Sequence, residues 1–442
     1  MPAVVNNPGI LRSSPRQGGV TEMGGSVGDA SRPFQVFVKP AGAACNLACR
    51  YCYYVGKAGD QAGVPRMADD LLDTYIRQHL DAAPASDVLF SWHGGEPTLL
   101  GLDYFRHIVR LQEQHVRPGR RIRNGIQTNG ILLDDEWAAF FAAHGFRVGL
   151  SIDGPADLHD EHRITRGQGP THAAVLRAFE TLQRHRVPTE VLCVVHATNV
   201  RHPLRVYRFF RKIGARAIGF LPLVVPLAGS EGGGTAESVD PGALGRFLCE
   251  VFDEWRERDA ARIEVQLFDE ASRPARGLEH GLCVFRPTCG DVPVLERTGD
   301  FYACDHFVDD AHRVGNLAET PLLHLLDSDR QRAFGEAKRR TLPRQCLACE
   351  VLPMCNGGCP KDRFITADDG EPGLNYLCAA YKRFFTHVLP WALEHGLAAR
   401  GASPAFAWLA SPATPAAAAV SRNVPCPCGS GKKYKKCCGR HP

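Results

Sequence analysis

The chain of 442 residues has an ordinary composition for a soluble globular protein, with 44% hydrophobic and 23% charged residues. Its length predicts two or three domains, and no apolar run approaches the ~18 residues that a membrane span needs. The net charge of +4 does not describe the whole chain, because six basic residues and no acidic one lie between Ser421 and Pro442. Subtracting those six leaves 46 basic against 48 acidic residues, so the charge of the rest of the chain does not favour nucleic acid as a partner.

Residues 1–33 are rich in glycine, serine and asparagine and show neither hydrophobic periodicity nor an apolar signal core. They predict a disordered N-terminal extension on a cytoplasmic protein that does not enter a membrane.

Between residues 34 and 240, short apolar or β-branched runs alternate with amphipathic stretches of helical length. The runs predict six strands, at 34–39, 88–92, 121–127, 147–152, 190–196 and 217–224. The stretches between them predict helices at 68–82, 102–115, 134–144, 171–185 and 204–213. This alternation predicts a parallel sheet of βα units, either doubly wound or closed into a partial barrel.

Polar or glycine-rich turns follow the first four of these strands, at 45–52, 94–97, 127–130 and 151–154. Any one of them alone is an ordinary turn. The carboxyl ends of parallel strands meet at one face, where α/β barrels place their chemistry. Four such turns in register therefore predict a functional site at that face.

Beyond residue 240 the sequence predicts a helix at 241–258, a strand-like run at 263–268 and a helix at 381–394. A cysteine-dense region separates the last two elements and assigns 241–400 to a second domain. Residues 401–424 are rich in alanine and proline and predict a largely unstructured linker, which leads to a basic cysteine-containing tail at 425–442.

The 17 cysteines fall into groups of three, eight and four, and only Cys193 and Cys249 stand alone, as expected of core residues. Tight clusters without a secretion signal indicate metal binding rather than disulfides. The first group, Cys45-x3-Cys49-x2-Cys52, leaves one iron of a four-iron cluster without a protein ligand. A zinc site is the alternative, but its fourth ligand would have to come from elsewhere, for instance from His93.

This spacing, with Tyr51 before the last cysteine, resembles the radical S-adenosylmethionine superfamily over about residues 34–225. The resemblance implies that S-adenosylmethionine chelates the open iron and yields a 5′-deoxyadenosyl radical. It assigns cofactor contacts to the methionine amine (Gly95 and Glu96), to the carboxylate or ribose (Ser151 and Arg163) and to adenine (Tyr51 and Leu223). Two of these assignments have alternatives. Arg163 could instead be a surface residue of a helix, and Leu223 could be a core residue.

Eight cysteines follow between residues 283 and 378, enough for two fully ligated four-iron clusters. A zinc ribbon would use only four of them. The pattern resembles the SPASM domain. Cys283 and the sequence from Tyr302 to Phe307 further resemble anaerobic sulfatase-maturating enzymes, which oxidise a cysteine or serine of a sulfatase to Cα-formylglycine. That resemblance implies a first auxiliary cluster on Cys283, Cys289, Cys304 and Cys359, and a second on Cys346, Cys349, Cys355 and Cys378.

By the same resemblance Asp305 is the general base, which takes the thiol or hydroxyl proton while the substrate radical loses its electron. The alternative for Asp305 is a loop cap or a partner of His306.

The C-terminal tail resembles the SEC-C motif. Four cysteines there could hold one zinc ion and fold a docking module for another protein: Cys426, Cys428, Cys437 and Cys438.

We therefore expect a partial (β/α)6 barrel with a C-terminal iron–sulfur SPASM domain and a small zinc-binding tail. The expected cofactors are S-adenosylmethionine, three 4Fe-4S clusters and zinc. The expected partners are an unfolded or nascent sulfatase polypeptide and a low-potential donor such as flavodoxin or ferredoxin. Alternatives are a SPASM-type maturase of another ribosomal peptide, for instance one forming thioether cross-links, and a zinc-rich binding protein.

Overall fold

The computed structural model describes residues 29–52, 54, 65–227 and 232–395, together with Lys433 and Lys436. The four tail cysteines, Cys426, Cys428, Cys437 and Cys438, and the predicted linker lie outside the described residues. Within the described part of the chain, no helix is long and apolar enough to cross a membrane.

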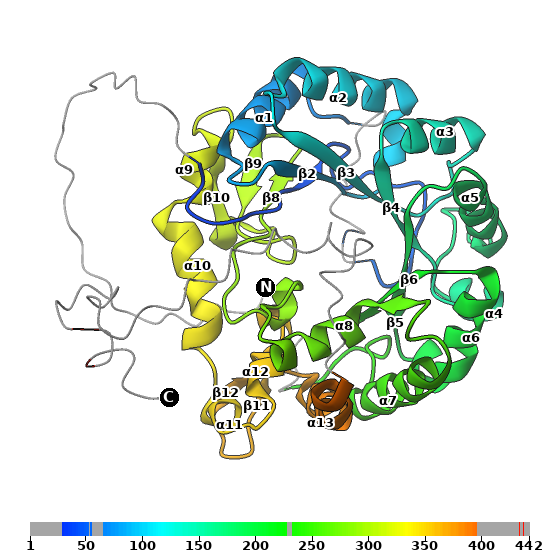
Figure 1. Ribbon diagram of the computed structural model, residues 1–442, viewed down its shortest axis with the longest axis vertical. Helices are drawn as coiled ribbons and strands as arrows, with labels where there is room; N and C mark the ends of the chain where they lie inside the picture. The colour runs from blue at the N-terminus through cyan, green and yellow to red at the C-terminus, as the bar shows by residue number, and fades with distance from the viewer. Residues whose placement is uncertain are drawn as a thin grey trace.

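The main sheet has ten strands in the order β10-β9-β8-β1-β2-β3-β4-β5-β6-β7. Six parallel strands form its centre: β1 (Phe37–Lys39), β2 (Asp87–Trp92), β3 (Arg121–Thr128), β4 (Phe146–Ser151), β5 (Thr189–Val195) and β6 (Ala217–Pro222). The helices between them are α1 (Asp69–Ala82), α2 (Leu102–His115), α3 (Asp135–Ala143), α4 (Ala156–His159), α5 (His172–Arg184) and α6 (Pro203–Ile213). The strands curve with these helices on their outer side, as a partial barrel does (Figure 1). The six predicted strands are therefore confirmed.

The second part of the chain extends this sheet at both edges. At one edge β7 (Glu264–Val265) joins β6 in parallel. At the other edge β8 (Val294–Glu296) runs parallel to β1, and β9 (Asp300–Tyr302) and β10 (Arg313–Asn316) follow antiparallel. The remaining elements are α7 (Pro241–Arg258), α8 (Gln266–Ser272), α9 (Leu322–Leu326), α10 (Asp329–Arg340), α11 (Arg344–Leu347), α12 (Leu352–Cys355), α13 (Cys378–His395) and the hairpin of β11 (Ile365–Thr366) and β12 (Pro372–Leu374).

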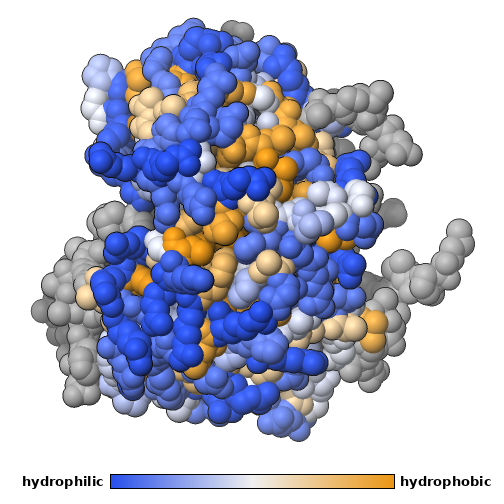
Figure 2. Space-filling model, turned by 90° about the vertical axis from the view of Figure 1, so that its right-hand side faces the viewer, coloured by the Kyte–Doolittle hydropathy of each residue, from blue (hydrophilic) through white to orange (hydrophobic). Residues whose placement is uncertain are grey.

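The main core lies between the outer side of the strands and the helices. On α1, for example, Leu72, Tyr75 and Ile76 are fully buried, and their spacing puts them on one face of the helix. The ends of the helices follow local signals, since Asp134 caps α3 by accepting a hydrogen bond from the Trp137 N–H at 3.0 Å. The surface in Figure 2 is largely hydrophilic, with hydrophobic residues gathered along the middle of that face.

Two sequence predictions are corrected. The strand predicted at 263–268 is wrong beyond its first residues, because only Glu264–Val265 pair with β6 and helix α8 begins at Gln266. The disorder predicted for 1–33 is wrong for residues 29–33, which contact the body, and residues 1–28 lie outside the described residues. The Ala30 N–H donates to the Ala82 carbonyl, and Arg32 lies 3.3 Å from Asp291.

Candidate active site

The turn after β1 and the turn after β2 lie against each other, held by two backbone hydrogen bonds. The Gly95 N–H donates to the Gly42 carbonyl and the Glu96 N–H to the Ala44 carbonyl, each at 2.8 Å. A Cβ at Gly95 would lie 2.1 Å from the Ala44 carbonyl oxygen, so only glycine permits this approach. Cys45 follows directly, so the shape of the first cysteine turn depends on Gly95.

Glu96 is fully buried and joins the turns after β2 and β3. Its Oε1 accepts hydrogen bonds from the Thr98 hydroxyl (2.6 Å) and the Thr128 hydroxyl (2.8 Å), and its Oε2 accepts one from the Asn129 N–H (2.7 Å). Burial raises the pKa of Glu96, although these hydrogen bonds oppose the shift. The carboxylate thus positions Asn129, whose amide lies 3.7 Å from the Cys45 sulfur.

The three cysteines of the first turn lie close enough together to influence one another. Burial raises the pKa of Cys45 to about 11, and the thiols of Cys49 and Cys52 contribute to the increase. Burial also raises the pKa of Cys49, against the effect of the nearby Arg163 guanidinium. Three converging thiols beside one cation fit the ligation of an iron–sulfur cluster with one open iron.

Arg163 forms a buried ion pair at the end of β4, so the surface position considered for it is wrong. Its Nε lies 2.9 Å from Asp153 Oδ2, and Tyr51 donates its hydroxyl to the same carboxylate. Burial opposes ionisation of Asp153, but Arg163 and His159 keep its pKa below the ordinary value. The guanidinium also lies 5.5 Å from the centre of the Tyr51 ring.

The two other expected cofactor contacts lie at the ends of neighbouring strands. Ser151, the last residue of β4, is 7% exposed. Leu223 follows β6, is partly exposed, and donates its N–H to the Val195 carbonyl at 2.8 Å. The structure therefore places both at the same end of the sheet as the cysteine turn.

Asp305, which follows β9, forms an ion pair with Lys39, the last residue of β1, at 2.5 Å. Lys39 is 1% exposed and also interacts with the hydroxyl of Tyr54. Burial opposes the ionisation of Asp305, but Lys39 and His306 hold its pKa well below the ordinary range. No motif in the sequence indicated Lys39, whose only signal is its position at the end of a strand that precedes the cysteine turn.

His93, considered above as a fourth zinc ligand, stacks on Phe37 with ring centres 3.9 Å apart. Burial lowers its pKa to about 4, against the effect of the Asp305 carboxylate. Across the described residues, no three Cys, His, Asp or Glu side chains are close enough to hold a single metal ion. A four-iron cluster does not need that closeness, because each thiolate binds a different iron.

The eight later cysteines fall into two neighbourhoods. Burial raises the pKa of Cys304, and Cys359 and Cys283 raise it further. Burial is also the main cause that raises the pKa of Cys289, and the Cys283 thiol raises it further. In the other neighbourhood burial raises the pKa of Cys355 to about 12, with contributions from three further cysteines, Cys378, Cys346 and Cys349.

One buried and one half-buried cation, Lys338 and Arg363, accompany the Cys283 neighbourhood. Lys338 is 1% exposed and donates to the carbonyls of Cys283 (2.8 Å) and Val284 (2.9 Å). Burial lowers its pKa, and Cys289 and Cys283 oppose that shift. Arg363 donates to the carbonyls of Gly357 and Lys338. Neither cation has a carboxylate partner among the described residues, so both fit beside an anionic, thiolate-ligated cluster.

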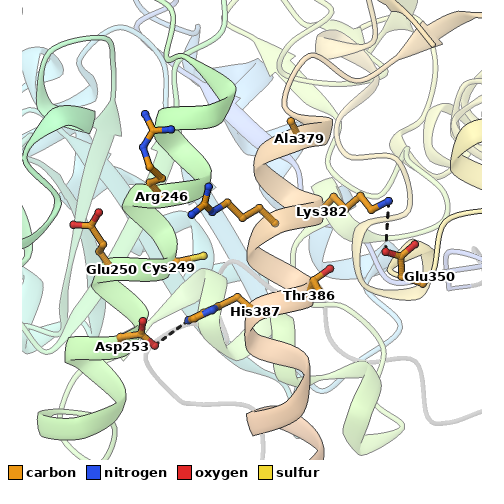
Figure 3. A pocket seen from close by; sticks show the side chains of 10 residues that line it. Arg246, Cys249, Glu250, Asp253, Glu350, Ala379, Lys382, Thr386 and His387 are labelled. Atoms are coloured by element: carbon orange, nitrogen blue, oxygen red, sulfur yellow. Dashed lines mark hydrogen bonds and ion pairs between the residues drawn. The ribbon is translucent and has the colours of Figure 1, made fainter. Parts of the chain in front are cut away.

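A surface groove lies between α7 and α13, at the end of α13 that begins with Cys378 (Figure 3). In it Lys382 lies 3.5 Å from Glu350, and His387 lies 2.9 Å from Asp253. Two further groove cations, Arg246 and Arg383, form no ion pair with the described carboxylates.

Family models match three parts of the chain. The radical SAM superfamily matches residues 40–210, an iron–sulfur cluster-binding domain matches 290–350, and the SEC-C motif matches 422–440. Together with the partial barrel and its cysteine turn, these matches define a radical S-adenosylmethionine enzyme with a SPASM domain. It uses S-adenosylmethionine and iron–sulfur clusters, so the alternative of a zinc-rich binding protein is wrong.

Two relatives narrow the class. A serine-type anaerobic sulfatase-maturating enzyme of Bacteroides thetaiotaomicron is 40% identical over 376 residues, which cover 82% of this chain and 91% of the relative. A cysteine-type enzyme of Clostridium perfringens is 32% identical over 363 residues, covering 81% and 97%. A solved structure, native anSMEcpe with bound AdoMet and Cp18Cys peptide, matches with a TM-score of 0.75 and 31% identity over 83% of this chain and 99% of that one. The chain belongs to the anaerobic sulfatase-maturating enzymes.

Proposed function

We propose that this protein oxidises a cysteine or serine of a sulfatase polypeptide to Cα-formylglycine. The observation that carries the proposal is Asp305, a carboxylate that directly follows Cys304 and is ion-paired with Lys39 at the end of β1. Asp305 thus lies near the end of the barrel strand from which the first cysteine turn departs. Bound S-adenosylmethionine supplies the radical chemistry that removes one hydrogen atom from the substrate Cβ.

Asp305 then accepts the proton of the substrate thiol or hydroxyl. The cluster that Cys304 would help to hold would supply an acceptor for the one electron that the substrate radical loses. The substrate side chain thereby loses one hydrogen atom, one proton and one electron, which balances its oxidation from alcohol to aldehyde or from thiol to thioaldehyde. Water converts the thioaldehyde to the aldehyde with release of sulfide. The Lys39 ammonium keeps Asp305 ionised, and so able to accept that proton.

For the metal ligands we propose three four-iron clusters. Cys45, Cys49 and Cys52 hold the first, and the later cysteines hold the two auxiliary clusters, split as Cys283, Cys289, Cys304 and Cys359 against Cys346, Cys349, Cys355 and Cys378. The mutual influence of the thiols within each group supports this split. Zinc in the tail is a fourth metal site, on Cys426, Cys428, Cys437 and Cys438.

For the cofactor contacts we propose Tyr51, Gly95, Ser151, Arg163 and Leu223, which the barrel brings to one end of its strands. Glu96 belongs to the same set, but its hydrogen bonds to Thr128 and Asn129 favour a bracing role in which it holds the turns after β2 and β3 together.

For the electron donor we propose a flavodoxin- or ferredoxin-like protein that docks at the groove between α7 and α13. The groove is lined by both acidic and basic residues, of which Arg246 and Arg383 have no ion-pair partners among the described carboxylates and could pair with acidic groups of the carrier. Ala379 lines the groove and directly follows Cys378, the first residue of α13, so a cluster held by Cys378 would lie close to a donor docked there. The basic tail is a second docking element, for the polypeptide substrate.

The test is anaerobic incubation of the reconstituted protein with two sulfatase-derived peptides that carry Ser-x-Pro-x-Arg or Cys-x-Pro-x-Arg, followed by mass spectrometry. We expect the aldehyde product from at least one peptide, together with 5′-deoxyadenosine. Cleavage of S-adenosylmethionine with no aldehyde from either peptide would refute the sulfatase substrate and favour another peptide. Iron analysis should give about twelve irons per chain.

A further inference from the structure

A second polar cluster lies at the end of the barrel opposite the cysteine turn. Glu190 is near the start of β5 and Glu264 is the first residue of β7. Because side chains alternate along a strand, Glu190 points away from the face where Val191 and Cys193 pack in the core with the helices. It therefore faces the inside of the curved sheet, as does Ser151 on the neighbouring strand, which shares the face of Gly149, the register partner of Glu190.

The Glu190 carboxylate is buried without a partner. The residue is 2% exposed, and neither oxygen accepts a hydrogen bond from any residue that the structure describes. Oε2 of Glu264 is likewise buried without such a bond. Burial raises the pKa of Glu190, and the Glu264 carboxylate raises it further. A buried carboxylate near a second, partly buried one is strongly unfavourable when both are ionised unless something compensates the charge.

A neutral side chain points into the same space. Gln266, the first residue of α8, is 6% exposed, and its amide makes no hydrogen bond with the rest of the described chain. Gln266 Oε1 lies 3.3 Å and Glu190 Oε1 lies 3.2 Å from the point where a Cβ would stand on Gly219. The two oxygens therefore approach the same point over a glycine, and the Cδ2 methyl of Leu192 lies 3.0 Å from that point.

The nearest cations do not neutralise this cluster. Arg147 on β4 is partly buried, and burial lowers its pKa despite the influence of Glu264. It forms no ion pair with the carboxylates of the described residues. Arg123 on β3 lies 3.4 Å from Asp87 and is thereby engaged at the outer end of β2.

We propose that Glu190, Glu264 and Gln266 bind a hard divalent cation of the Mg²⁺ or Ca²⁺ class. Such cations take oxygen ligands, and Mg²⁺ in particular is commonly held by one or two carboxylates with water in its remaining positions. Two carboxylates and an amide oxygen are a ligand set of this kind, and thiolate-seeking metals would not favour it. The cation links β5 to β7 and to the first residue of α8. It thereby holds the two-residue strand β7 at the edge of the barrel.

The competing explanation is one proton shared between Glu190 and Glu264. The two can be separated by titrating the reconstituted full-length protein with MgCl₂ and with CaCl₂, using calorimetry for binding and thermal unfolding for stability. We expect saturable binding of one cation per chain to wild type and an increase in the unfolding midpoint.

Glu190→Gln should weaken binding at least ten-fold and remove the increase in the midpoint. Without cation this variant should be at least as stable as wild type, because a repulsion is lost, so misfolding does not obscure the result. Gln266→Met should weaken binding less, since it removes a neutral ligand. Glu113→Gln, at an exposed position of α2, is the matched control and should bind as wild type does.

Absence of saturable binding of either cation at millimolar concentration overturns the proposal and leaves the shared proton. Equal binding by wild type and Glu190→Gln also overturns it, because the cation would then lie elsewhere. Formylglycine formation is not a readout here, so the proposed activity and this site can fail independently.

Discussion

Beside the first cysteine turn the buried charged groups are two carboxylates, Glu96 and Asp153, and one cation, Arg163. Beside the Cys283 neighbourhood lie the buried Lys338 and the half-buried Arg363, both without a carboxylate partner in the described chain, and one buried carboxylate, Asp362, which is ion-paired with Lys361. A cluster that carries four thiolates is permanently anionic, and fixed cations suit it. A cluster with one open iron must admit a ligand that brings its own charges. Beside the first turn, accordingly, both carboxylates already have partners in the protein: Glu96 accepts hydrogen bonds from Thr128 and Asn129, and Asp153 is ion-paired with Arg163.

Gly95→Ala disrupts the first cysteine turn and should have the largest effect on iron content and on cleavage of S-adenosylmethionine. The added Cβ would overlap the Ala44 carbonyl and separate the two turns. We expect the loss of about four irons per chain and of all S-adenosylmethionine cleavage. Gly167→Ala is the control, because the nearest atom to its Cβ is 3.8 Å away. Iron analysis and chromatography of 5′-deoxyadenosine measure both effects, and a variant with full iron content and cleavage would contradict the assigned role of Gly95.

Asp305→Asn tests the link between the two regions and should have the next largest effect. An amide cannot take the substrate proton, so formylglycine formation should fall about 10²–10⁴-fold. Cleavage of S-adenosylmethionine should remain close to that of wild type, because Asp305 is not part of the first turn. Asp310→Asn, at an exposed position nearby, should leave both unchanged. Full product yield from Asp305→Asn would rule out its role as the base.

Much of the fold could be predicted from the sequence, and there is a physical reason why the rest could not. Amphipathic spacing predicted α2 (Leu102–His115) and α7 (Pro241–Arg258) to the residue, because one face of each packs against the core. The run at 263–268 was misassigned, because a short apolar run does not distinguish a strand from a buried helix.

The pairing of Lys39 with Asp305 had no local signal at all. It depends on β8 adding to β1, which places Glu296 opposite Lys39 and brings the following hairpin to the end of the barrel strand. Such a contact between distant segments appears only when the sheet is assembled. The charges beside the later cysteines were missed for the same reason, since Lys338 reaches the carbonyl of Cys283 from α10.

Lys338→Met tests the cationic side of the comparison and should have an intermediate effect. Its ammonium stabilises the more negative, reduced state of an adjacent cluster, so removing it should lower that cluster's reduction potential. We expect a several-fold slower formylglycine formation with iron content retained, and a shifted signal in an EPR redox titration. Lys338→Arg, which keeps the charge, should move the potential less. An unchanged potential in Lys338→Met would mean that the charge beside these cysteines is not functional.

Arg383→Ser, at the groove outside both regions, should have the smallest effect. Exposed charges mainly guide encounter between partners, so the rate with a flavodoxin-type donor should fall a few-fold and lose part of its dependence on salt. With the small reductant dithionite the variant should match wild type, because no docking is needed. Arg177→Ser, at an exposed position of α5, is the matched control. Equal rates for Arg383→Ser and Arg177→Ser with the protein donor would place electron entry elsewhere. Slower turnover with dithionite would show that Arg383 acts inside the protein and not on the encounter with the donor.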